Sequence, residues 1–265
     1  MTRRVFLGSS AALGAAALGY SAISNELEVT HSRAIGRSTA TGLRVAVATD
    51  MHAPHDYIDQ QAFSDAVRRF DPHLMCVVGD AIERRGTEPL VQFYGESTGR
   101  LGKFAVYGNW EYYGRIVPEV LSREYERAGF RLLMNETVRL DFEGRPIDLI
   151  GLDDLLGGAP DYSLGRIRSG DAPDTPAIVL SHCPLTFDRM VPIVDRPIHM
   201  LAGHTHGGQI APFGWAPVRP WGSGRYVAGW YRGSGGSALY VSRGLGNSGA
   251  PFRIGSRPEL ALLTF

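Results

Sequence analysis

The feature that most constrains the fold is an alternation, starting at residue 43, of apolar runs of strand length with stretches of helical periodicity. The first run, 43–49, is followed by apolar residues at helical spacing from Phe63 to Phe70, which stop at an Asp-Pro pair. Further predicted strands are 74–78 and 104–107, and further predicted helices are 88–98 and 117–128. Because such alternation builds a parallel sheet covered by helices, we expect an α/β fold.

The second half of the chain has more apolar runs and fewer helical stretches. We predict strands near 131–134, 137–142, 147–152, 177–180 and 197–202, and late strands at 239–242 and 260–265. Segments rich in glycine and proline interrupt them at 157–176 and 207–236, which we expect to be loops. The second loop also holds several aromatic residues, which either pack the loop down or form a wall that faces a substrate.

The N-terminus differs from the rest of the chain in composition. A pair of arginines precedes an apolar stretch, rich in alanine and glycine, that runs to about Ile23. This pattern predicts a twin-arginine export signal over 1–24, with the export machinery as a partner and a periplasmic or other extracytoplasmic location. Small residues at its end suit cleavage, whereas an uncleaved segment would anchor the protein in the membrane. Residues 25–42 are polar and without clear period, which predicts a linker to one domain over 43–265.

Composition and charge exclude two classes of protein. Hydrophobic residues make up 44% and charged residues 20% of the 265, which is typical of a globular rather than a disordered chain. The formal net charge is zero and there is no basic stripe, so we expect no nucleic-acid partner. Any recognition of a phosphate group must therefore be local.

Five of the predicted strands end in side chains that can bind a metal ion. These side chains are, in chain order, Asp50 with His52, Asp80, Asn109, His182, and His204 with His206. Because functional groups gather at the carboxyl ends of parallel strands, we expect these seven to converge. Three oxygen ligands and four imidazoles suit Mn, Fe, Zn, Co or Ni better than Mg or Ca. Seven ligands are too many for one tetrahedral ion, and they fit two divalent ions that share a bridging carboxylate.

These stretches resemble, in order and approximate spacing, the motifs of the calcineurin-like metallophosphoesterases. The matching motifs are Asp50-Met-His52, Gly79-Asp80, Gly108-Asn109, Ser181-His182 and Gly203-His-Thr-His206. The resemblance runs from about residue 43 to the C-terminus. The twin-arginine start, the run Gly-His-Thr-His-Gly-Gly-Gln and the ending Arg-Pro-Glu-Leu-Ala-Leu-Leu-Thr-Phe are most similar to an exported bacterial phosphodiesterase branch. The fold of that family implies a four-layer α/β/β/α sandwich here.

The resemblance also implies a role for each motif residue. In the family pattern the first ion would be held by Asp50, His52 and His206 and the second by Asn109, His182 and His204, with Asp80 as the bridge. We predict Asp80, Asn109 and His204 to be catalytic. A hydroxide between the ions would attack phosphorus in line with the leaving oxygen. The resemblance thus implies a dinuclear-metal phosphohydrolase, above all a phosphodiesterase, for a small-molecule or lipid phosphoester or pyrophosphate.

The sequence departs from the family immediately after Asn109. The family has a histidine and then an acid there, whereas this chain has Trp110 and Glu111. Indole cannot transfer a proton near neutral pH, which leaves three explanations open. The leaving group is already stable as an anion, as in a pyrophosphate or an aryl ester; or another histidine such as His55 serves; or turnover is lost while metal binding remains. We favour the first and predict that Trp110 binds substrate by stacking, although core packing would explain it equally well.

Two alternatives to the phosphodiesterase stay open. A related branch that hydrolyses UDP-2,3-diacylglucosamine, a nucleotide-lipid pyrophosphatase, also departs from histidine at that position. Its lipid precursor is made on the cytoplasmic face, so export would count against this function. A module that binds metal or phospholipid without catalysis belongs to a different class. Alanine at His182 or Asp80 discriminates, because a pure binder has no activity to lose.

Overall fold

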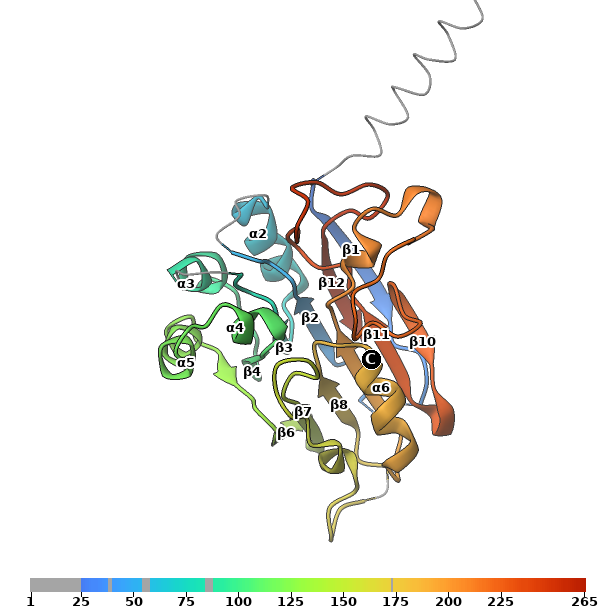
Figure 1. Ribbon diagram of the computed structural model, residues 1–265. Coiled ribbons are helices and arrows are strands. Elements are labelled where there is room, and N and C mark those ends of the chain that lie inside the picture. Colours follow the sequence, from blue (N-terminus) through green and yellow to red (C-terminus); the bar gives the residue numbers. More distant parts are fainter. Residues whose placement is uncertain (1–24, 38–39, 54–57, 84–87, 173) are drawn as a thin grey trace, which may run out of the picture.

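The computed structural model describes residues 25–37, 40–53, 58–83, 88–172 and 174–265. The predicted export signal, 1–24, and His55 lie outside these residues. Among the described residues, the strands form two six-stranded sheets (Figure 1). The first sheet has the order β1 (Glu28–Arg33), β12 (Glu259–Thr264), β2 (Arg44–Ala48), β3 (Leu74–Val78), β4 (Gly102–Val106) and β5 (Arg131–Leu132). The second has the order β10 (Gly229–Arg232), β11 (Ala238–Val241), β9 (Ile198–Ala202), β8 (Ala177–Leu180), β7 (Arg145–Gly151) and β6 (Glu136–Phe142).

Parallel pairing brings the ends of strands to a common edge in both sheets. The strands from β2 to β5 are parallel, and so are those from β7 through β8 and β9 to β11. Antiparallel neighbours occur nearer the sheet edges, where β2 pairs with β12, β6 with β7, and β10 with β11. The residues that follow β2, β3, β8 and β9 are therefore positioned to meet.

The helices cover the outer faces of the sheets. They are α2 (Gln60–Phe70), α3 (Glu88–Tyr94), α4 (Asn109–Tyr113), α5 (Pro118–Arg127) and α6 (Leu185–Met190). Short 3-10 turns lie at η1 (Tyr162–Gly165), η2 (Val191–Ile193), η3 (His206–Gly208), η4 (Pro212–Gly214) and η5 (Ser234–Gly236). In Figure 1, α2 to α5 lie beside the first sheet and α6 lies beside the second.

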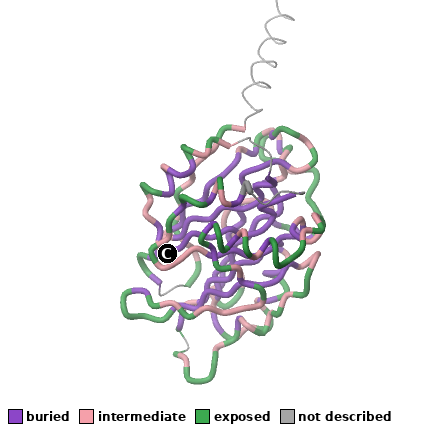
Figure 2. The backbone as a smooth tube through the Cα atoms, turned by 90° about the vertical axis from the view of Figure 1, so that its left-hand side faces the viewer, coloured by how far each residue is buried: buried purple, intermediate pink, exposed green. Residues whose placement is uncertain are grey.

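Alternation along the strands fills three apolar layers. In β2, Val45 and Val47 face the other sheet, while Ala46 and Ala48 face the helices that carry Phe63 and other large apolar residues. Strand β8 likewise points alternate residues inward and toward α6. Helix, sheet, sheet and helix therefore stack in four layers, which confirms the predicted sandwich. Buried residues run through the middle of the molecule, and exposed residues lie mainly in its loops (Figure 2).

The predicted linker over 25–42 is wrong for part of its length. Residues Glu28–Arg33 form β1, which pairs in parallel with β12 at the edge of the first sheet. The strand is an edge strand whose residues are mostly half-buried, so its sequence Glu-Val-Thr-His-Ser-Arg contains no apolar run. The predicted loop 207–236 similarly contains β10, and the third predicted strand is followed at once by the short helix α4. In the described part of the chain, none of the helices combines the length and apolar character needed to span a bilayer.

Candidate metal centre

Six of the seven predicted ligands form two buried triads where the strand ends meet. The triads are Asp50, His52 and His206, and Asp80, His182 and His204. In each triad the three candidate ligand atoms all lie within 4.8 Å of one another. Residues that are separated by more than 150 positions in the sequence are thus brought together by the parallel strands, as the sequence predicted.

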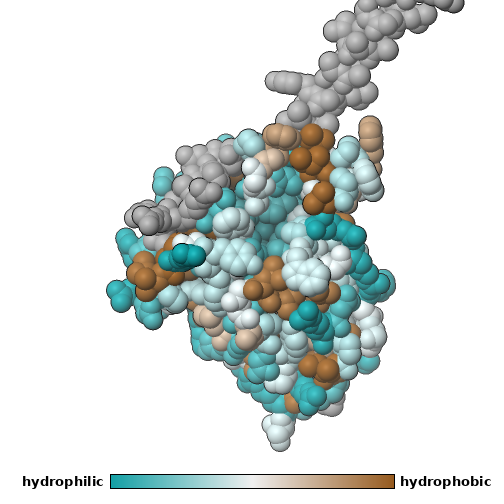
Figure 3. Space-filling view, viewed as in Figure 1, coloured by the Kyte–Doolittle hydropathy of each residue, from teal (hydrophilic) through white to brown (hydrophobic). Residues whose placement is uncertain are grey.

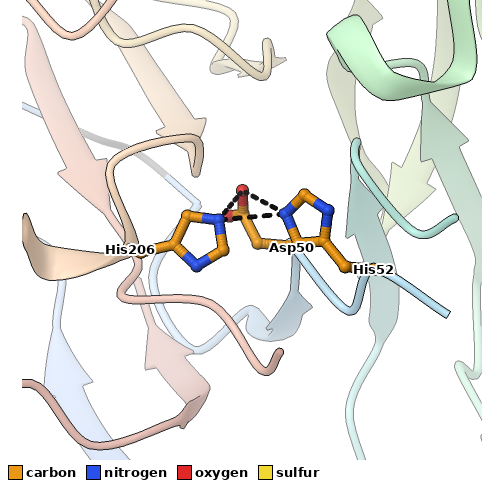
Figure 4. Close-up of side chains that lie close together, drawn as sticks. All are labelled: Asp50, His52 and His206. Atoms are coloured by element: carbon orange, nitrogen blue, oxygen red, sulfur yellow. Dashed lines mark hydrogen bonds and ion pairs between the residues drawn. The ribbon is translucent and has the colours of Figure 1, made fainter. Parts of the chain in front are cut away.

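The side chains of the first triad point toward a common position (Figure 4). The Nε2 atoms of His52 and His206 are 2.9 Å apart. They lie 3.9 and 3.4 Å, respectively, from Oδ1 of Asp50. Two imidazole nitrogens and a carboxylate oxygen directed at one point are ligands that a divalent transition metal ion binds well.

The second triad shares a border with the first. Nε2 of His182 lies 3.0 Å from Oδ2 of Asp80 and 3.3 Å from Nδ1 of His204. The same Asp80 oxygen is 3.8 Å from Nε2 of His52, in the first triad. One carboxylate oxygen therefore lies between histidines of both triads, where a bridging ligand would have to be.

The seventh predicted ligand, Asn109, lies at the start of α4 and lines the same cavity as Asp80 and His204. Its side-chain oxygen is buried and has no hydrogen-bond partner among the described residues. An unpaired buried carbonyl costs about 1–3 kcal/mol, and coordination to a cation would remove that cost. The donor set and this orphaned oxygen both fit a metal ion at the second triad.

The backbone at the site is held in a conformation that side chains rarely adopt. Asp50, His52, Asp80, His204 and His206 have φ angles of 53°, 51°, 50°, 71° and 51°. Each such residue costs on the order of 1–3 kcal/mol and persists only where the surrounding structure fixes it. Close approach of the loops helps to fix them: a Cβ atom at Gly203 would collide with Thr49 and the Asp50 carboxylate.

A buried carboxylate joins the loops that follow β3 and β4. The Glu111 side chain accepts hydrogen bonds from the backbone N–H groups of Asp80 at 2.9 Å, Ala81 at 2.8 Å and Gly108 at 2.8 Å. Burial, reinforced by the charge of Asp80, raises the pKa of Glu111 to about 7. No role for this acid was predicted from the sequence. Its position in the third residue of a helix, where an acid reaches back to free N–H groups, was the available signal.

A buried arginine supports His206 and was not predicted from the sequence. Arg253 donates hydrogen bonds to the backbone oxygens of His206 at 3.2 Å, Arg243 at 2.7 Å and Gly246 at 3.0 Å. One of its terminal nitrogens lies 3.1 Å from Nδ1 of His206. Burial lowers the pKa of Arg253 to about 10, so the guanidinium stays charged at neutral pH. It therefore fixes both the backbone and the ring of this triad residue.

The protonation states suit metal binding. Burial lowers the pKa of His52 to about 4 and lowers those of His204 and His206 as well, which leaves neutral rings with free lone pairs at pH 7. Burial also acts on His182, but the facing carboxylates of Asp80 and Asp50 outweigh it and raise the His182 pKa well above its usual value. A metal ion would displace that proton.

A cavity of about 480 Å³ opens beside the triads. Its polar lining includes Asp80, Asn109, His204 and His206, and its other walls are largely apolar. Trp110 belongs to the lining: its backbone N–H donates to Asp80 Oδ1 at 2.8 Å, and its ring meets the His52 ring edge-on, with centroids 6.1 Å apart. This is where a substrate-binding Trp110 would lie, and the binding role itself stays a prediction.

Residues 43–208 match the model of the family described as calcineurin-like phosphoesterase. The chain belongs to that family. It is 30% identical over 235 residues to an uncharacterized metallophosphoesterase of Bacillus subtilis, YkuE, with 84% of this chain and 79% of that protein covered. It is 31% identical over 163 residues to the phosphodiesterase YaeI of Escherichia coli, with 60% of this chain and 57% of that protein covered.

The fold of this calcineurin-like phosphoesterase is similar to that of the solved NAD nucleotidase of Haemophilus influenzae. The TM-score is 0.52 at 14% identity, and the match covers 77% of this chain and 45% of that chain. The protein is thus a metal-dependent phosphoric ester hydrolase of a family that uses divalent metal ions. The two triads are its candidate metal sites.

Proposed function

We propose that this calcineurin-like phosphoesterase is a phosphodiesterase that uses two divalent ions, as expected from the exported bacterial branch that its motifs resemble. The proposed ligands are Asp50, His52 and His206 for one ion, Asn109, His182 and His204 for the other, and Asp80 between them. The observation that carries the proposal is the position of the Asp80 Oδ2 atom, 3.0 Å from His182 and 3.8 Å from His52. It supports a shared ligand of two adjacent ions rather than two independent sites.

When bound, the two ions would lower the pKa of a water molecule and neutralise charge on the phosphoryl oxygens. The surrounding backbone orients the rings for this task. His182 Nδ1 lies 2.9 Å from the oxygen of Val78, and His204 Nε2 lies 2.7 Å from the oxygen of Trp221. Each carbonyl accepts a hydrogen bond from its ring, so the opposite nitrogen keeps its lone pair toward the site.

The described lining of the cavity favours some leaving groups over others. Of the described residues that line it, the titratable ones are Asp80, His204 and His206, all of them proposed ligands. This part of the chain therefore supplies no free acid to protonate a departing oxygen. The arrangement supports substrates whose leaving group is stable as an anion, such as aryl phosphodiesters or pyrophosphates.

We expect the Mn-loaded protein to hydrolyse bis(p-nitrophenyl) phosphate with a kcat/KM at least about a hundredfold above that for glycerol phosphate, because an acid contributes 10²–10⁴-fold to expulsion of an alkoxide. Initial rates with both substrates at matched metal concentration measure this ratio. If the protein preferred the alkyl monoester, a stable leaving group could not explain why Trp110 replaces the histidine of the family.

Export is a separate part of the proposal. It is supported by the paired arginines and the apolar stretch within residues 1–24, which predict passage through the twin-arginine machinery and a periplasmic or membrane-anchored protein. A nucleotide-lipid pyrophosphatase of the UDP-2,3-diacylglucosamine type is the second candidate, favoured by the apolar walls of the cavity, which include Trp110, Ile210 and Val218. Including such a nucleotide lipid in the substrate screen separates the two.

A further inference from the structure

Two loops at the mouth of the cavity carry large apolar side chains that face the solvent. We call these six the apolar rim: Ile210, Phe213, Trp215, Val218, Trp221 and Phe252. Phe213 is fully exposed, and Trp221 and Trp215 are 77% and 69% exposed. Single exposed apolar residues are ordinary on a protein surface, whereas six on two joined loops mark a surface that contacts something other than water.

The two loops are fixed to each other by hydrogen bonds. The Ala211 N–H donates to the oxygen of Ile254 at 2.7 Å, and the Ile254 N–H donates to the oxygen of Gln209 at 2.9 Å. The Gln209 side chain donates to the oxygen of Ala250 at 2.8 Å and accepts from the Ser248 N–H at 3.0 Å. The apolar rim is therefore part of a hydrogen-bonded structure.

The apolar rim continues into the cavity. Ile210 and Val218 belong to the rim and also line the cavity that holds Asp80 and His204. An apolar surface in contact with the rim would thus lie directly beside the proposed ions. A substrate held in that surface would reach the site with its phosphate group first.

The chain enters the domain beside the apolar rim. Asn25, the first described residue, lies between the loop residues Asn247 and Pro251: its Oδ1 accepts from the Asn247 side chain at 3.4 Å, and its Nδ2 donates to the Pro251 oxygen at 3.5 Å. Twenty-four residues precede it, and 5–23 contain no charged residue. Figure 3 shows hydrophobic side chains gathered at this end of the molecule, where Figure 1 places the loops near the start of β1.

The charges on these loops suit the surface of an anionic bilayer. Neither 207–222 nor 244–258 contains an aspartate or a glutamate, and Arg219 and Arg225 are exposed on and beside the first of them. Tryptophan and phenylalanine beside arginine, without acids, is the composition that places a surface at the boundary between lipid headgroups and acyl chains.

We propose that the apolar rim docks on a lipid bilayer and that the cavity receives a phosphodiester carried by an amphiphile in that bilayer. The docking stands on the exposure, position and charge of the rim and needs no turnover. The choice of an amphiphilic substrate rests on the proposed phosphodiesterase function. Two experiments keep these parts separate.

The docking is tested by quenching of tryptophan fluorescence in the full chain. The protein is mixed with vesicles of about two parts phosphatidylcholine to one part phosphatidylglycerol, with and without bromine on the acyl chains. Brominated lipid should quench the emission, and the double variant Trp215→Phe, Trp221→Phe should remove at least about half of that quenching, because both tryptophans lie at the rim. The matched control is Trp230→Phe, since Trp230 is only partly exposed and donates to Ser32 Oγ at 2.9 Å. Equal quenching in wild type and in the double variant Trp215→Phe, Trp221→Phe would overturn the docking.

The substrate class is tested with the double variant Phe213→Ser, Trp215→Ser. Neither residue lines the cavity. We expect its turnover of a vesicle-embedded phosphodiester to fall at least about tenfold, while turnover of a soluble aryl diester stays within about twofold. The control Met134→Ser, Ile193→Ser removes two apolar residues of 43% and 41% exposure elsewhere and should lower neither rate.

The remaining outcomes are also decisive. If the double serine variant loses turnover equally on both substrates, the amphiphilic substrate is contradicted. If the wild type is inactive on both substrates, the proposed phosphodiesterase function is contradicted, and the quenching result still tests the docking. The rim could instead pair two copies of the chain. In that case brominated lipid would not quench the emission, the wild type would be a dimer, and the double serine variant would be a monomer. This result would overturn the membrane as the partner of the rim.

Discussion

Asp80→Asn is expected to lower kcat/KM for an aryl phosphodiester by about 10²–10³-fold, which is the loss caused by removing one group that stabilises charge in a transition state. The substitution keeps the shape of the side chain and removes its charge. The charged oxygen lies 3.0 Å from His182 and 3.8 Å from His52, so its loss affects both triads at once. Steady-state rates at saturating Mn measure the effect.

A matched variant separates this effect from a general change in charge. Asp188 lies on α6, is exposed, and accepts a hydrogen bond from the Tyr226 hydroxyl at 2.6 Å, which an asparagine can also accept. Asp188→Asn should keep the wild-type rate. If Asp80→Asn also kept a rate close to that of the wild type, Asp80 would not be a shared ligand. If the wild-type protein itself had no phosphodiesterase activity, the non-catalytic binding module would be favoured.

Glu111→Ala is expected to lower the free energy of unfolding by about 3 kcal/mol or more, because each unsatisfied buried N–H costs about 1–3 kcal/mol. Its three N–H donors, on Asp80, Ala81 and Gly108, would be left buried with no acceptor from this side chain. Urea unfolding followed by circular dichroism measures the change. Activity should fall as well, since the backbone on either side of the proposed bridge is then released.

The control for Glu111 is Glu119→Ala, an exposed glutamate of α5, which should change the free energy of unfolding by no more than about 0.5 kcal/mol. Glu111→Gln is an informative intermediate, because its oxygen accepts from some of these donors while its amide group faces the others. A Glu111→Ala protein as stable as wild type would show that these hydrogen bonds contribute little.

Much of the site could be predicted because each ligand follows a short buried strand. Asp50 and Asp80 follow β2 and β3 of the first sheet after one intervening residue, and His182 follows β8 of the second in the same way; apart from Arg44 at the start of β2, these strands are apolar. Parallel pairing then brings such ends to one edge within each sheet. The four-layer arrangement could not be predicted from the strand and helix pattern alone. Alternation of strands and helices predicts a sheet with helices on it, and only the resemblance to a known family implied the second sheet.

The residues that support the ligands could not be predicted in the same way. Arg253 is separated from His206 by 47 positions, and a single arginine gives no sign of which backbone oxygens it will meet. The edge strand β1 was missed because its pattern is polar. For the aromatic loop, the packing interpretation holds for Tyr226, which is buried, whereas Phe213 and Trp215 face the solvent and a substrate-facing wall stays a prediction.

The most direct test of the two-ion site is the metal content of the purified full chain, measured by plasma mass spectrometry after loading with Mn and removal of unbound metal. The family membership and the two triads predict two ions per chain. The double variant His52→Ala, His206→Ala should retain only the ion of the second triad. A wild-type chain that retains no ion would contradict the paired site. So would a wild-type chain that retains one ion, if the double variant retains the same single ion at full occupancy.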